Sequence, residues 1–274
     1  MKRGAIVLCG GRSSRMGRAK AWLPWFGQTM IEHVVGVLGP LVDEIVVVTA
    51  EDLELPPIDA RVVRDREPDR GPLAGLRDGL LATQSEFAFV TSTDVPHLPT
   101  AYVEALFARG RACAPVADGH VQVLSAVYPK EGGRVAEELL SEGRGRPLHL
   151  LEALDYEGVD ERELGPLDEP KPWHGFNTPE AYLAAVRAHD PSARAEVELL
   201  GRSALHADET RHSIPVGTLG EVLGILPDAL GLLDGDRVAK PYLVSLGGRD
   251  VVRDLSLPVG PGERVSVIDA LAGG

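Results

Sequence analysis

Short apolar runs alternate with amphipathic helical patterns along roughly the first 190 residues of the chain. Each run is rich in β-branched side chains, which predicts strands. The predicted strands are Ala5–Leu8, Glu44–Thr49, Arg61–Arg64, Phe87–Thr91, Ala112–Val116 and Leu124–Tyr128. Because strands that alternate with helices build parallel sheets, we predict an α/β fold with a Rossmann-like, mostly parallel sheet covered by helices.

Capping patterns mark where several helices begin. Thr29, with Glu32 three residues later, forms a capping-box pattern, and Thr100 is expected to cap another helix. A last helix is predicted to begin at Thr178-Pro179, because Thr is a good N-cap and Pro fits the first helical turn. This helix is expected to end near Asp190-Pro191.

The pattern changes after this helix to that of a smaller unit. The strands predicted there are Glu196–Leu200, Tyr242–Leu246 and Arg264–Ile268. Thr218 and Glu221 form a capping box for one short helix, and the whole segment fits a β-β-α-β-β order. About 80 residues of this kind are enough for a small core. We therefore expect two domains, at 1–190 and 194–274, the second of them α+β.

Composition excludes several classes of protein. The formal net charge of −13 argues against general nucleic-acid binding, which requires an excess of Lys and Arg. No stretch approaches the roughly 18 apolar residues of a membrane span, and the first apolar run lacks the features of a signal peptide. Cys9 and Cys113 have no spacing typical of metal ligands or redox pairs. We expect a cytoplasmic protein with neither nucleic-acid nor membrane partners.

The strongest chemical signal follows the first predicted strand. It consists of Leu8, Cys9, Gly10 and Gly11, followed by the basic residues Arg12, Arg15, Arg18 and Lys20. A glycine turn at the carboxyl end of a parallel strand gathers backbone N–H groups where a phosphate can bind. Taken alone, Gly10-Gly11 is more typical of a structural turn, but the basic cluster favours a polyphosphate. The spacing matches neither GxGxxG nor GxxxxGK[ST].

Two aspartates follow predicted strands. Asp94 comes after Phe87–Thr91, at the strand end where open α/β sheets bind ligands, and its carboxylate suits Mg²⁺. The alternative is a turn, because Asp before Val95-Pro96 is also typical of a turn start. Asp65 follows Arg61–Arg64 and is either a nucleotide contact or a solvated acid in a charged run.

Four motifs together resemble the molybdenum cofactor guanylyltransferases, over about residues 4–188. They are the loop Gly10–Lys20, Gly71-Pro72-Leu73-Ala74-Gly75, Thr93-Asp94-Val95-Pro96, and Phe176-Asn177-Thr178-Pro179-Glu180. Two positions depart from the family pattern. Ala19 stands where the family usually has an aspartate, which puts substrate positioning in doubt, and Cys9 replaces an alanine. Cys9 is expected to act as a small hydrophobe.

The resemblance implies transfer of GMP from GTP to molybdopterin, with Mg²⁺ as the cofactor. It implies Arg15, Lys20 and Asp94 as catalytic residues, Asp94 as the metal ligand, and Asn177 as a contact to the pterin. The nucleotide-binding residues implied are Leu8, Cys9, Gly10, Gly11, Lys20, Thr49, Asp65, Gly75 and Asp94. A related transferase that uses CTP or a sugar phosphate, and a non-catalytic scaffold, remain alternatives.

The sequence ends in Gly273-Gly274. Such glycines are common in flexible termini, but residues 194–274 also resemble ubiquitin-like sulfur carriers with a β-grasp core, particularly the small subunit of molybdopterin synthase. That resemblance implies a thiocarboxylate at Gly274. It also implies two partners, the large subunit of molybdopterin synthase and an adenylating activator.

Overall fold

The computed structural model describes residues 2–10, 15–67, 70–205 and 207–269, which form two compact units. The first unit comprises Met1–Arg12, Lys20–Trp22 and Met30–Gly175, and the second comprises Ser13–Ala19, Leu23–Thr29 and Phe176–Gly274. The units thus group two short N-terminal segments with the C-terminal part of the chain. The expected domain boundaries at 190 and 194 stay a prediction about independent folding.

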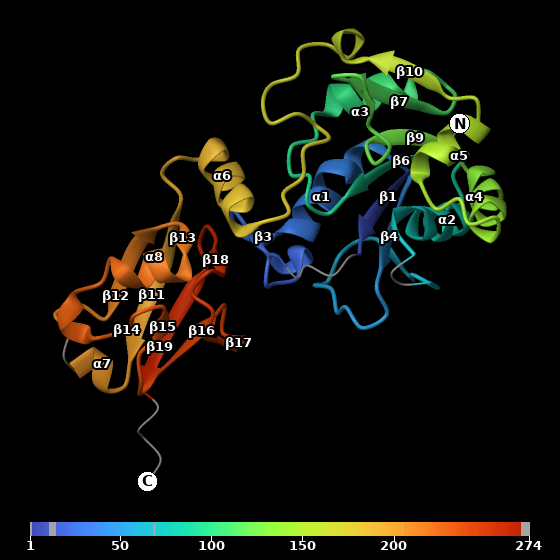
Figure 1. Cartoon of the computed structure of the whole chain (residues 1–274). Helices are drawn as coiled ribbons and strands as arrows, with labels where there is room; N and C mark the ends of the chain where they lie inside the picture. Colours follow the sequence, from blue (N-terminus) through green and yellow to red (C-terminus); the bar gives the residue numbers. More distant parts are fainter. Residues whose placement is uncertain (1, 11–14, 68–69, 206, 270–274) are drawn as a thin grey trace. The chain divides into compact units, whose positions relative to one another are not determined.

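One large sheet forms the centre of the first unit (Figure 1). Its strands, in spatial order, are β10 (Glu157–Asp160), β7 (Cys113–Ala117), β9 (Ala126–Pro129), β6 (Phe87–Ser92), β1 (Arg3–Cys9), β4 (Glu44–Thr49) and β5 (Arg61–Arg64), with β8 (His120–Val121) paired to β7. Strand β1 runs parallel to both β4 and β6, whereas β9 is antiparallel to β6 and β7. The prediction of a mostly parallel sheet flanked by helices is confirmed.

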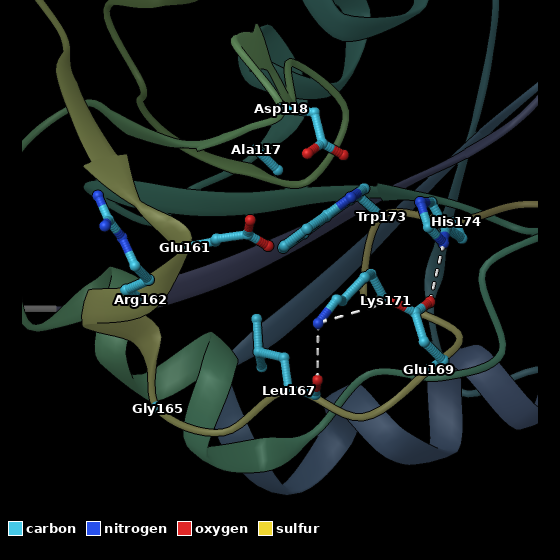
Figure 2. A pocket seen from close by; sticks show the side chains of 10 residues that line it. All are labelled: Ala117, Asp118, Glu161, Arg162, Gly165, Leu167, Glu169, Lys171, Trp173 and His174. Atoms are coloured by element: carbon cyan, nitrogen blue, oxygen red, sulfur yellow. Dashed lines mark hydrogen bonds and ion pairs between the residues drawn. The ribbon is translucent and has the colours of Figure 1, made fainter.

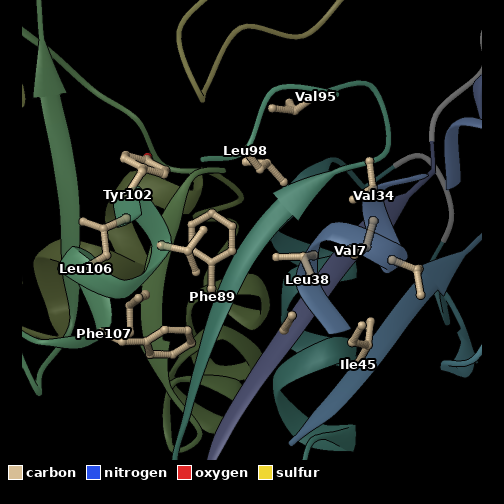
Figure 3. Packing of buried hydrophobic residues seen from close by; sticks show 14 of the residues in the cluster. Val7, Val34, Leu38, Ile45, Phe89, Val95, Leu98, Tyr102, Leu106 and Phe107 are labelled. Carbon is tan, nitrogen blue, oxygen red and sulfur yellow. The ribbon is translucent and has the colours of Figure 1, made fainter. Parts of the chain in front are cut away.

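Helices cover both faces of this sheet. They are α1 (Met30–Leu38), α2 (Pro72–Ala82), α3 (Thr100–Phe107), α4 (Gly132–Ser141) and α5 (Pro147–Ala153), with short 3₁₀ turns at Lys20–Trp22, Gly39–Leu41 and Glu161–Leu164. Strand alternation divides the buried side chains into two cores. Val7, Ile45 and Phe89 pack with α1 and α3 (Figure 3), and Ile6 and Val46 pack with α2, α4 and α5 on the opposite face. Burial on both faces explains why these strands appear in the sequence as continuous apolar runs.

Helix starts test the capping predictions. Thr178 is the N-cap of α6 (Pro179–His189), and its Oγ1 accepts a hydrogen bond from the Ala181 amide at 3.3 Å, as predicted. The prediction for Thr100 is wrong. Pro99 occupies the N-cap of α3 in an extended conformation, Thr100 is already helical, and no side-chain cap bond forms.

The second unit has a five-stranded sheet in the order β12 (Arg211–Pro215), β11 (Arg194–Leu200), β19 (Arg264–Asp269), β16 (Tyr242–Leu246) and β17 (Asp250–Val252). Strands β11 and β19 are parallel and the other neighbours are antiparallel. Helix α8 (Leu219–Gly224) packs against the sheet, and the predicted capping box between Thr218 and Glu221 is confirmed.

Smaller elements complete this unit. They are the hairpin β2 (Pro24–Trp25) and β3 (Gln28–Thr29), α7 (Arg202–Leu205), the paired β13 (Gly217–Thr218) and β18 (Pro258–Val259), a 3₁₀ turn at Asp228–Leu230, and the hairpin β14 (Leu233–Asp234) and β15 (Arg237–Val238). Across the described parts of both units, no helix is long and apolar enough to cross a membrane.

Candidate active site

A lysine–aspartate pair lies at the carboxyl end of the central strands of the first unit. Asp94 follows β6, and its Oδ2 lies 2.5 Å from the Nζ of Lys20 in the 3₁₀ turn after the phosphate loop. Both side chains are mostly buried, with exposed fractions of 19% for Lys20 and 12% for Asp94. An ion pair that is largely shielded from water keeps much of its electrostatic strength. Two residues predicted from separate motifs therefore meet in one place.

The backbone around Asp94 is fixed to the neighbouring strand and helix. Thr93 donates to the Leu8 carbonyl from both its amide, at 3.2 Å, and its hydroxyl, at 3.3 Å. Ser92 Oγ donates a short hydrogen bond to the second carboxylate oxygen of Asp94. On the other side, His33 Nε2 of α1 donates to the Pro96 carbonyl at 2.8 Å. These bonds hold the carboxylate in one orientation at the end of β6.

Gly175 lies directly against the Asp94 carboxylate. A Cβ built on Gly175 would come within 2.9 Å of Asp94 Cγ and Oδ1, closer than real Cβ contacts allow. Only a glycine leaves the carboxylate its present space. The sequence contained a clue, because Gly175 immediately precedes the Phe176-Asn177 motif, but a close approach between distant segments cannot be derived from spacing.

The carboxyl ends of β1 and β4 lie beside the Asp94 carboxylate. Cys9 and Thr49 are register partners in the parallel pair, and both are buried. Burial raises the pKa of the Cys9 thiol, so the side chain stays protonated at neutral pH. This agrees with the expectation that Cys9 replaces an alanine as a small hydrophobe. The predicted contact between Thr49 and the nucleotide stays a prediction.

Asp65 follows β5 and is joined to the same edge of the sheet. Its amide donates to the Thr49 carbonyl at 2.8 Å, and its carboxylate accepts from the Glu67 amide at 2.9 Å. Gly75, in α2, faces the end of β1, where an added Cβ would touch Leu8 at 3.5 Å. Leu8, Lys20, Thr49, Asp65, Gly75 and Asp94 therefore all border the carboxyl ends of four neighbouring strands.

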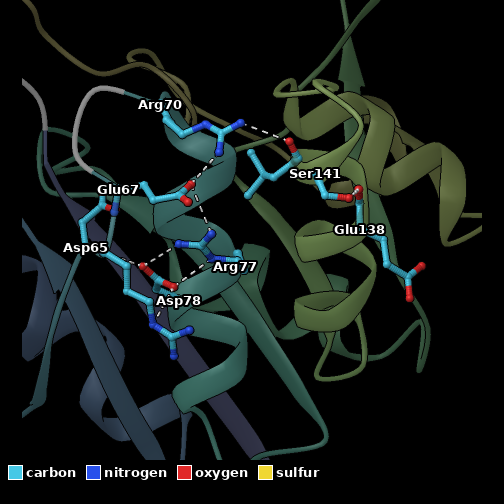
Figure 4. A network of polar contacts seen from close by, with 9 residues as sticks. Asp65, Glu67, Arg70, Arg77, Asp78, Glu138 and Ser141 are labelled. Carbon is cyan, nitrogen blue, oxygen red and sulfur yellow. Dashed lines mark hydrogen bonds and ion pairs between the residues drawn. The ribbon is translucent and has the colours of Figure 1, made fainter.

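A buried ion-pair network supports the loop that begins at Asp65 (Figure 4). Asp78, whose side chain is fully buried in α2, accepts bonds from Arg77 Nε and the Arg66 amide, each at 2.9 Å. Arg77 also lies 3.4 Å from Glu67, and Glu67 pairs with Arg70 at 2.9 Å. The hydrogen bond that Arg77 donates to Asp78 raises the pKa of Arg77, so the guanidinium remains charged. None of the predictions from sequence included Arg77 or Asp78.

Other predicted site residues are placed elsewhere. Arg15 and Asn177 belong to the second unit, and both are exposed. Gly10 is exposed at the end of β1. Gly11 and Gly274 lie outside the described residues. The roles expected for these five residues stay predictions.

A hollow of about 450 Å³ lies near the end of β7 in the first unit (Figure 2). Lys171, on its wall, donates to the Leu167 carbonyl at 2.8 Å, and His174 lies 3.6 Å from Glu169. Trp173 adds an aromatic surface. Arg162, Lys171 and His174 already have acidic or carbonyl partners, and the residues that line the hollow include none of the predicted site residues.

The donors around Asp94 fit a magnesium ion. The residues that the structure describes contain no group of three or more His, Cys, Asp or Glu side chains that could hold a metal by themselves. Mg²⁺ does not need such a group, since it commonly takes one or two carboxylates and completes its shell with phosphate oxygens and water. The Asp94 carboxylate and the Ser92 hydroxyl provide hard oxygen donors at the carboxyl end of β6.

Comparison with solved structures identifies the class of fold. Molybdopterin-guanine dinucleotide biosynthesis protein A from Archaeoglobus fulgidus matches with a TM-score of 0.58 and 22% identity, over 69% of this chain and 99% of that one. 2-C-methyl-D-erythritol 4-phosphate cytidylyltransferase from Thermus thermophilus matches with a TM-score of 0.50 and 15% identity, over 66% and 96%. At these identities the similarity shows the fold, which is that of nucleotidyltransferases.

Sequence comparison then gives the family. The family model described as MobA-like NTP transferase domain matches residues 5–156. A probable molybdenum cofactor guanylyltransferase from Haloferax mediterranei is 34% identical over 59% of this chain and 82% of its own length, and one from Mycobacterium tuberculosis H37Rv is 33% identical over 64% and 91%. The chain belongs to the MobA-like NTP transferase family and is a nucleotidyltransferase.

Proposed function

We propose that the chain transfers GMP from GTP to molybdopterin, forming the guanine dinucleotide cofactor and pyrophosphate. The observation that carries this proposal is the pairing of Lys20 with Asp94 at the carboxyl end of β6. Family membership and the names of the relatives support the choice of GTP and the molybdenum cofactor as substrates. Transfer from CTP, or to a sugar phosphate, is the alternative that nucleotide competition tests.

In the proposed reaction, a terminal phosphate oxygen of molybdopterin attacks the α-phosphorus of GTP. The new P–O bond forms as the bond from the α-phosphorus to the bridging oxygen breaks, and pyrophosphate leaves with that electron pair. No covalent enzyme intermediate is required. Catalysis then consists mainly of positioning and of stabilising negative charge on the departing group.

The chain's own residues divide this work. Lys20 and Arg15 stabilise the charge that develops on pyrophosphate, and the backbone amides after β1 bind phosphate oxygens. The Asp94 carboxylate would hold Mg²⁺ together with the triphosphate, and the bound ion would neutralise charge on the phosphate oxygens. Lys20 orients this carboxylate before nucleotide arrives. Asp65 binds the nucleoside, and Asn177 contacts the pterin.

Turnover is tested by incubating the chain with molybdopterin, Mg²⁺ and each nucleoside triphosphate in turn, and measuring pyrophosphate. We expect release with GTP and loss of release in Lys20→Ala. Pyrophosphate release with CTP alone would show that CTP, and not GTP, is the nucleotide substrate. A chain that binds no triphosphate in the presence of Mg²⁺ would be a scaffold.

We also propose that residues 194–274 form a β-grasp sulfur carrier. The support is the strand order of the second unit, with two central parallel strands β11 and β19, antiparallel neighbours on each side, and α8 packed on the sheet. Gly273 and Gly274 lack Cβ atoms, so the Gly274 carboxyl could enter a narrow active site of a partner. An adenylating activator would convert this carboxyl to a thiocarboxylate, for delivery to the large subunit of molybdopterin synthase.

Mass spectrometry tests the sulfur-carrier proposal. The full chain is incubated with ATP, Mg²⁺, a sulfur donor and an adenylating enzyme of the sulfur-carrier type. We expect a mass increase equal to the replacement of one oxygen by sulfur, located in the C-terminal peptide. A chain that lacks Gly274 is the control, and equal labelling of that control would contradict the proposal.

A further inference from the structure

Arg18 of the phosphate loop is held by the C-terminal part of the second unit. Its Nη2 lies 2.6 Å from Glu263 Oε1, and its Nη1 lies 3.0 Å from both Glu263 Oε2 and the Pro258 carbonyl. The two residues are 245 positions apart in the sequence. Two parallel N–H···O contacts of this kind are the strongest geometry for an arginine–carboxylate pair.

Glu263 is positioned for this contact and is almost inaccessible to water. Its side chain is 3% exposed, while that of Arg18 is 17% exposed. The Gly260 amide donates to Glu263 Oε2 at 3.0 Å, so the backbone of the same loop fixes the carboxylate. A carboxylate this deeply buried requires a charged partner, since an unpaired buried charge is strongly unfavourable.

Packing around the pair joins the same two segments. Gly17 has a φ of +68° and lies so close to Leu257 that an added Cβ would come within 2.5 Å of its Cδ2. Met16 is 1% exposed. The Tyr182 hydroxyl of α6 donates a short hydrogen bond to the carbonyl of Pro24, which lies in the β2–β3 hairpin after Lys20. Met16, Gly17 and Arg18 are therefore packed into the second unit.

This arrangement separates Arg18 from the other basic residues of the loop. To bind a phosphate, Arg18 would have to leave Glu263 buried without a charged partner, whereas Arg15 is exposed. We propose that Arg18 is an anchor and that Glu263 is a positioning residue for triphosphate binding, which makes the C-terminal part of the chain a component of the transferase. The proposal depends on the GTP site described under Proposed function.

The consequence for the site follows from chain continuity. Arg15 comes three residues before the anchor and Lys20 two residues after it, so the position of Arg18 restricts both. Without the anchor, the loop would lose order that nucleotide binding must then restore. Ordering a few side chains and their backbone on binding lowers affinity by about tenfold. The effect should therefore fall on the KM for GTP more than on kcat.

The test compares Glu263→Gln with Glu198→Gln in the full-length chain. Glu198 makes an ion pair with Arg211 at 2.8 Å between β11 and β12. Glu198 is 19% exposed and Arg211 is 75% exposed, so the control removes the same charge from a pair whose arginine is open to water. Two quantities are measured: hydrogen exchange in peptides from residues 15–29, and the Kd and KM for GTP with Mg²⁺. We expect faster exchange and an affinity about tenfold lower in Glu263→Gln only.

The exchange measurement separates this proposal from the proposed function. If wild-type protein binds no GTP, the transferase assignment fails, while exchange still reports whether Glu263 holds the loop. Exchange equal to that of Glu198→Gln, or faster exchange with unchanged GTP affinity, would overturn the positioning role. If Glu263→Gln loses its cooperative thermal transition, GTP affinity is compared instead between Arg18→Glu and the charge-swapped double variant Arg18→Glu/Glu263→Arg. The anchor predicts recovery of affinity in the double variant, and no recovery overturns it.

Discussion

At the scale of single residues, the contact between Lys20 and Asp94 joins two motifs that are 74 positions apart. In the absence of nucleotide, Lys20 neutralises a carboxylate that is largely shielded from water. When Mg²⁺ and triphosphate arrive, the same lysine can transfer its interaction to phosphate oxygens, since both partners are oxygen anions. The pair thus keeps two opposite charges available at the site without a large desolvation penalty for either.

The first prediction concerns the charge of Asp94. Asp94→Asn keeps the size of the side chain but removes the negative charge that we propose binds Mg²⁺ and orients Lys20. We expect pyrophosphate release to fall by about 10²–10³-fold, the range found when one preorganised electrostatic group is removed from an active site.

Asp118→Asn is the matched control. The backbone of Asp118 has a φ of 49°, and asparagine also tolerates a positive φ. Its turnover should equal that of wild type. Full turnover in Asp94→Asn at ordinary Mg²⁺ concentration would remove Asp94 from the catalytic residues.

A second prediction concerns the space beside Asp94. In Gly175→Ala the new methyl group would overlap the carboxylate, so the Lys20–Asp94 pair must shift by several tenths of an ångström. We expect kcat to fall about tenfold or more, since catalytic groups must keep their productive geometry closely. Gly36→Ala in α1 is the control, because an added Cβ there meets no atom within 4 Å. Equal activity of both variants would show that Gly175 does not restrict the site.

At the scale of elements, the turn that follows a helix can be stabilised by hydrogen bonds to a single carboxylate. Glu44, at the start of β4, holds the turn that follows α2. One carboxylate oxygen accepts bonds from Thr83 Oγ1 at 2.5 Å, from the Gln84 and Ser85 amides at 2.6 Å, and from Ser85 Oγ at 2.7 Å. Partial burial opposes ionisation, but these bonds prevail and lower the pKa of Glu44 below its ordinary value.

A third prediction follows from the sign of this shift. A lowered folded-state pKa means that the charged form stabilises the fold above the unfolded-state pKa, and that this stability is lost as pH falls through the folded-state value. Glu44→Gln should lower the free energy of unfolding by about 2 kcal/mol at neutral pH, in the range for hydrogen bonds to charged groups. Denaturant titration should show that the difference from wild type shrinks below the ordinary carboxylate pKa of about 4. A difference that is constant with pH, or equal to that of exposed Glu104→Gln, would contradict the assignment.

A fourth prediction concerns the ion-pair network of α2. Asp78→Ala leaves the buried Arg77 guanidinium with only the partly exposed Glu67 as an acidic partner, and it leaves the Arg66 amide without its acceptor. We expect the free energy of unfolding to fall by about 3–5 kcal/mol, as for other buried pairs that lose one partner. Because the network supports the loop after Asp65, GTP affinity should fall as well. Arg162→Ala, an exposed pair with Asp160, serves as the control, and thermal unfolding with nucleotide titration measures both effects.

The strands that the sequence predicted well are short apolar runs with clear boundaries, and burial on both faces is not required, since most of β5 is exposed. The predicted bounds of β4, β5 and β16 agree with the structure residue for residue, because each apolar run ends in turn residues. Strand β12 had no predicted position, since among Arg211–Pro215 only Ile214 is buried and the rest are half-buried or exposed. With a single buried position, β12 carries only a weak periodic signal.

The site shows a similar division. Lys20 and Asp94 were predicted from the motifs that resemble the family and from the place of Asp94 at a strand end, and the structure brings the two side chains together. Gly175, Arg77 and Glu263 could not be predicted, because their importance comes from contacts between segments that lie far apart in the sequence. No local pattern contains that information.

At the scale of the whole molecule, the question is whether residues 191–274 contribute to nucleotidyl transfer. Truncation at the carboxyl end answers it in two steps. A chain that ends at Asp269 lacks the terminal Gly273-Gly274 and keeps every strand of the second unit. It should retain wild-type pyrophosphate release and thermal stability while losing any thiocarboxylate. Such a variant separates the proposed tail chemistry from the transferase.

The last prediction concerns a chain that ends at Asp190. This truncation removes Leu257 and Glu263, so Gly17 and Arg18 lose their contacts, and buried Tyr182 loses its neighbour Gly260. Newly exposed apolar surface lowers stability by about 25 cal/mol per Å². Without Glu263, Arg18 no longer restricts the positions of Arg15 and Lys20. We expect a Tm several degrees below that of the chain ending at Asp269 and a KM for GTP raised by at least as much as in Glu263→Gln. Calorimetry and initial-rate measurements check the two effects, and equal values for both truncated chains would mean that the C-terminal segment has no part in binding the triphosphate.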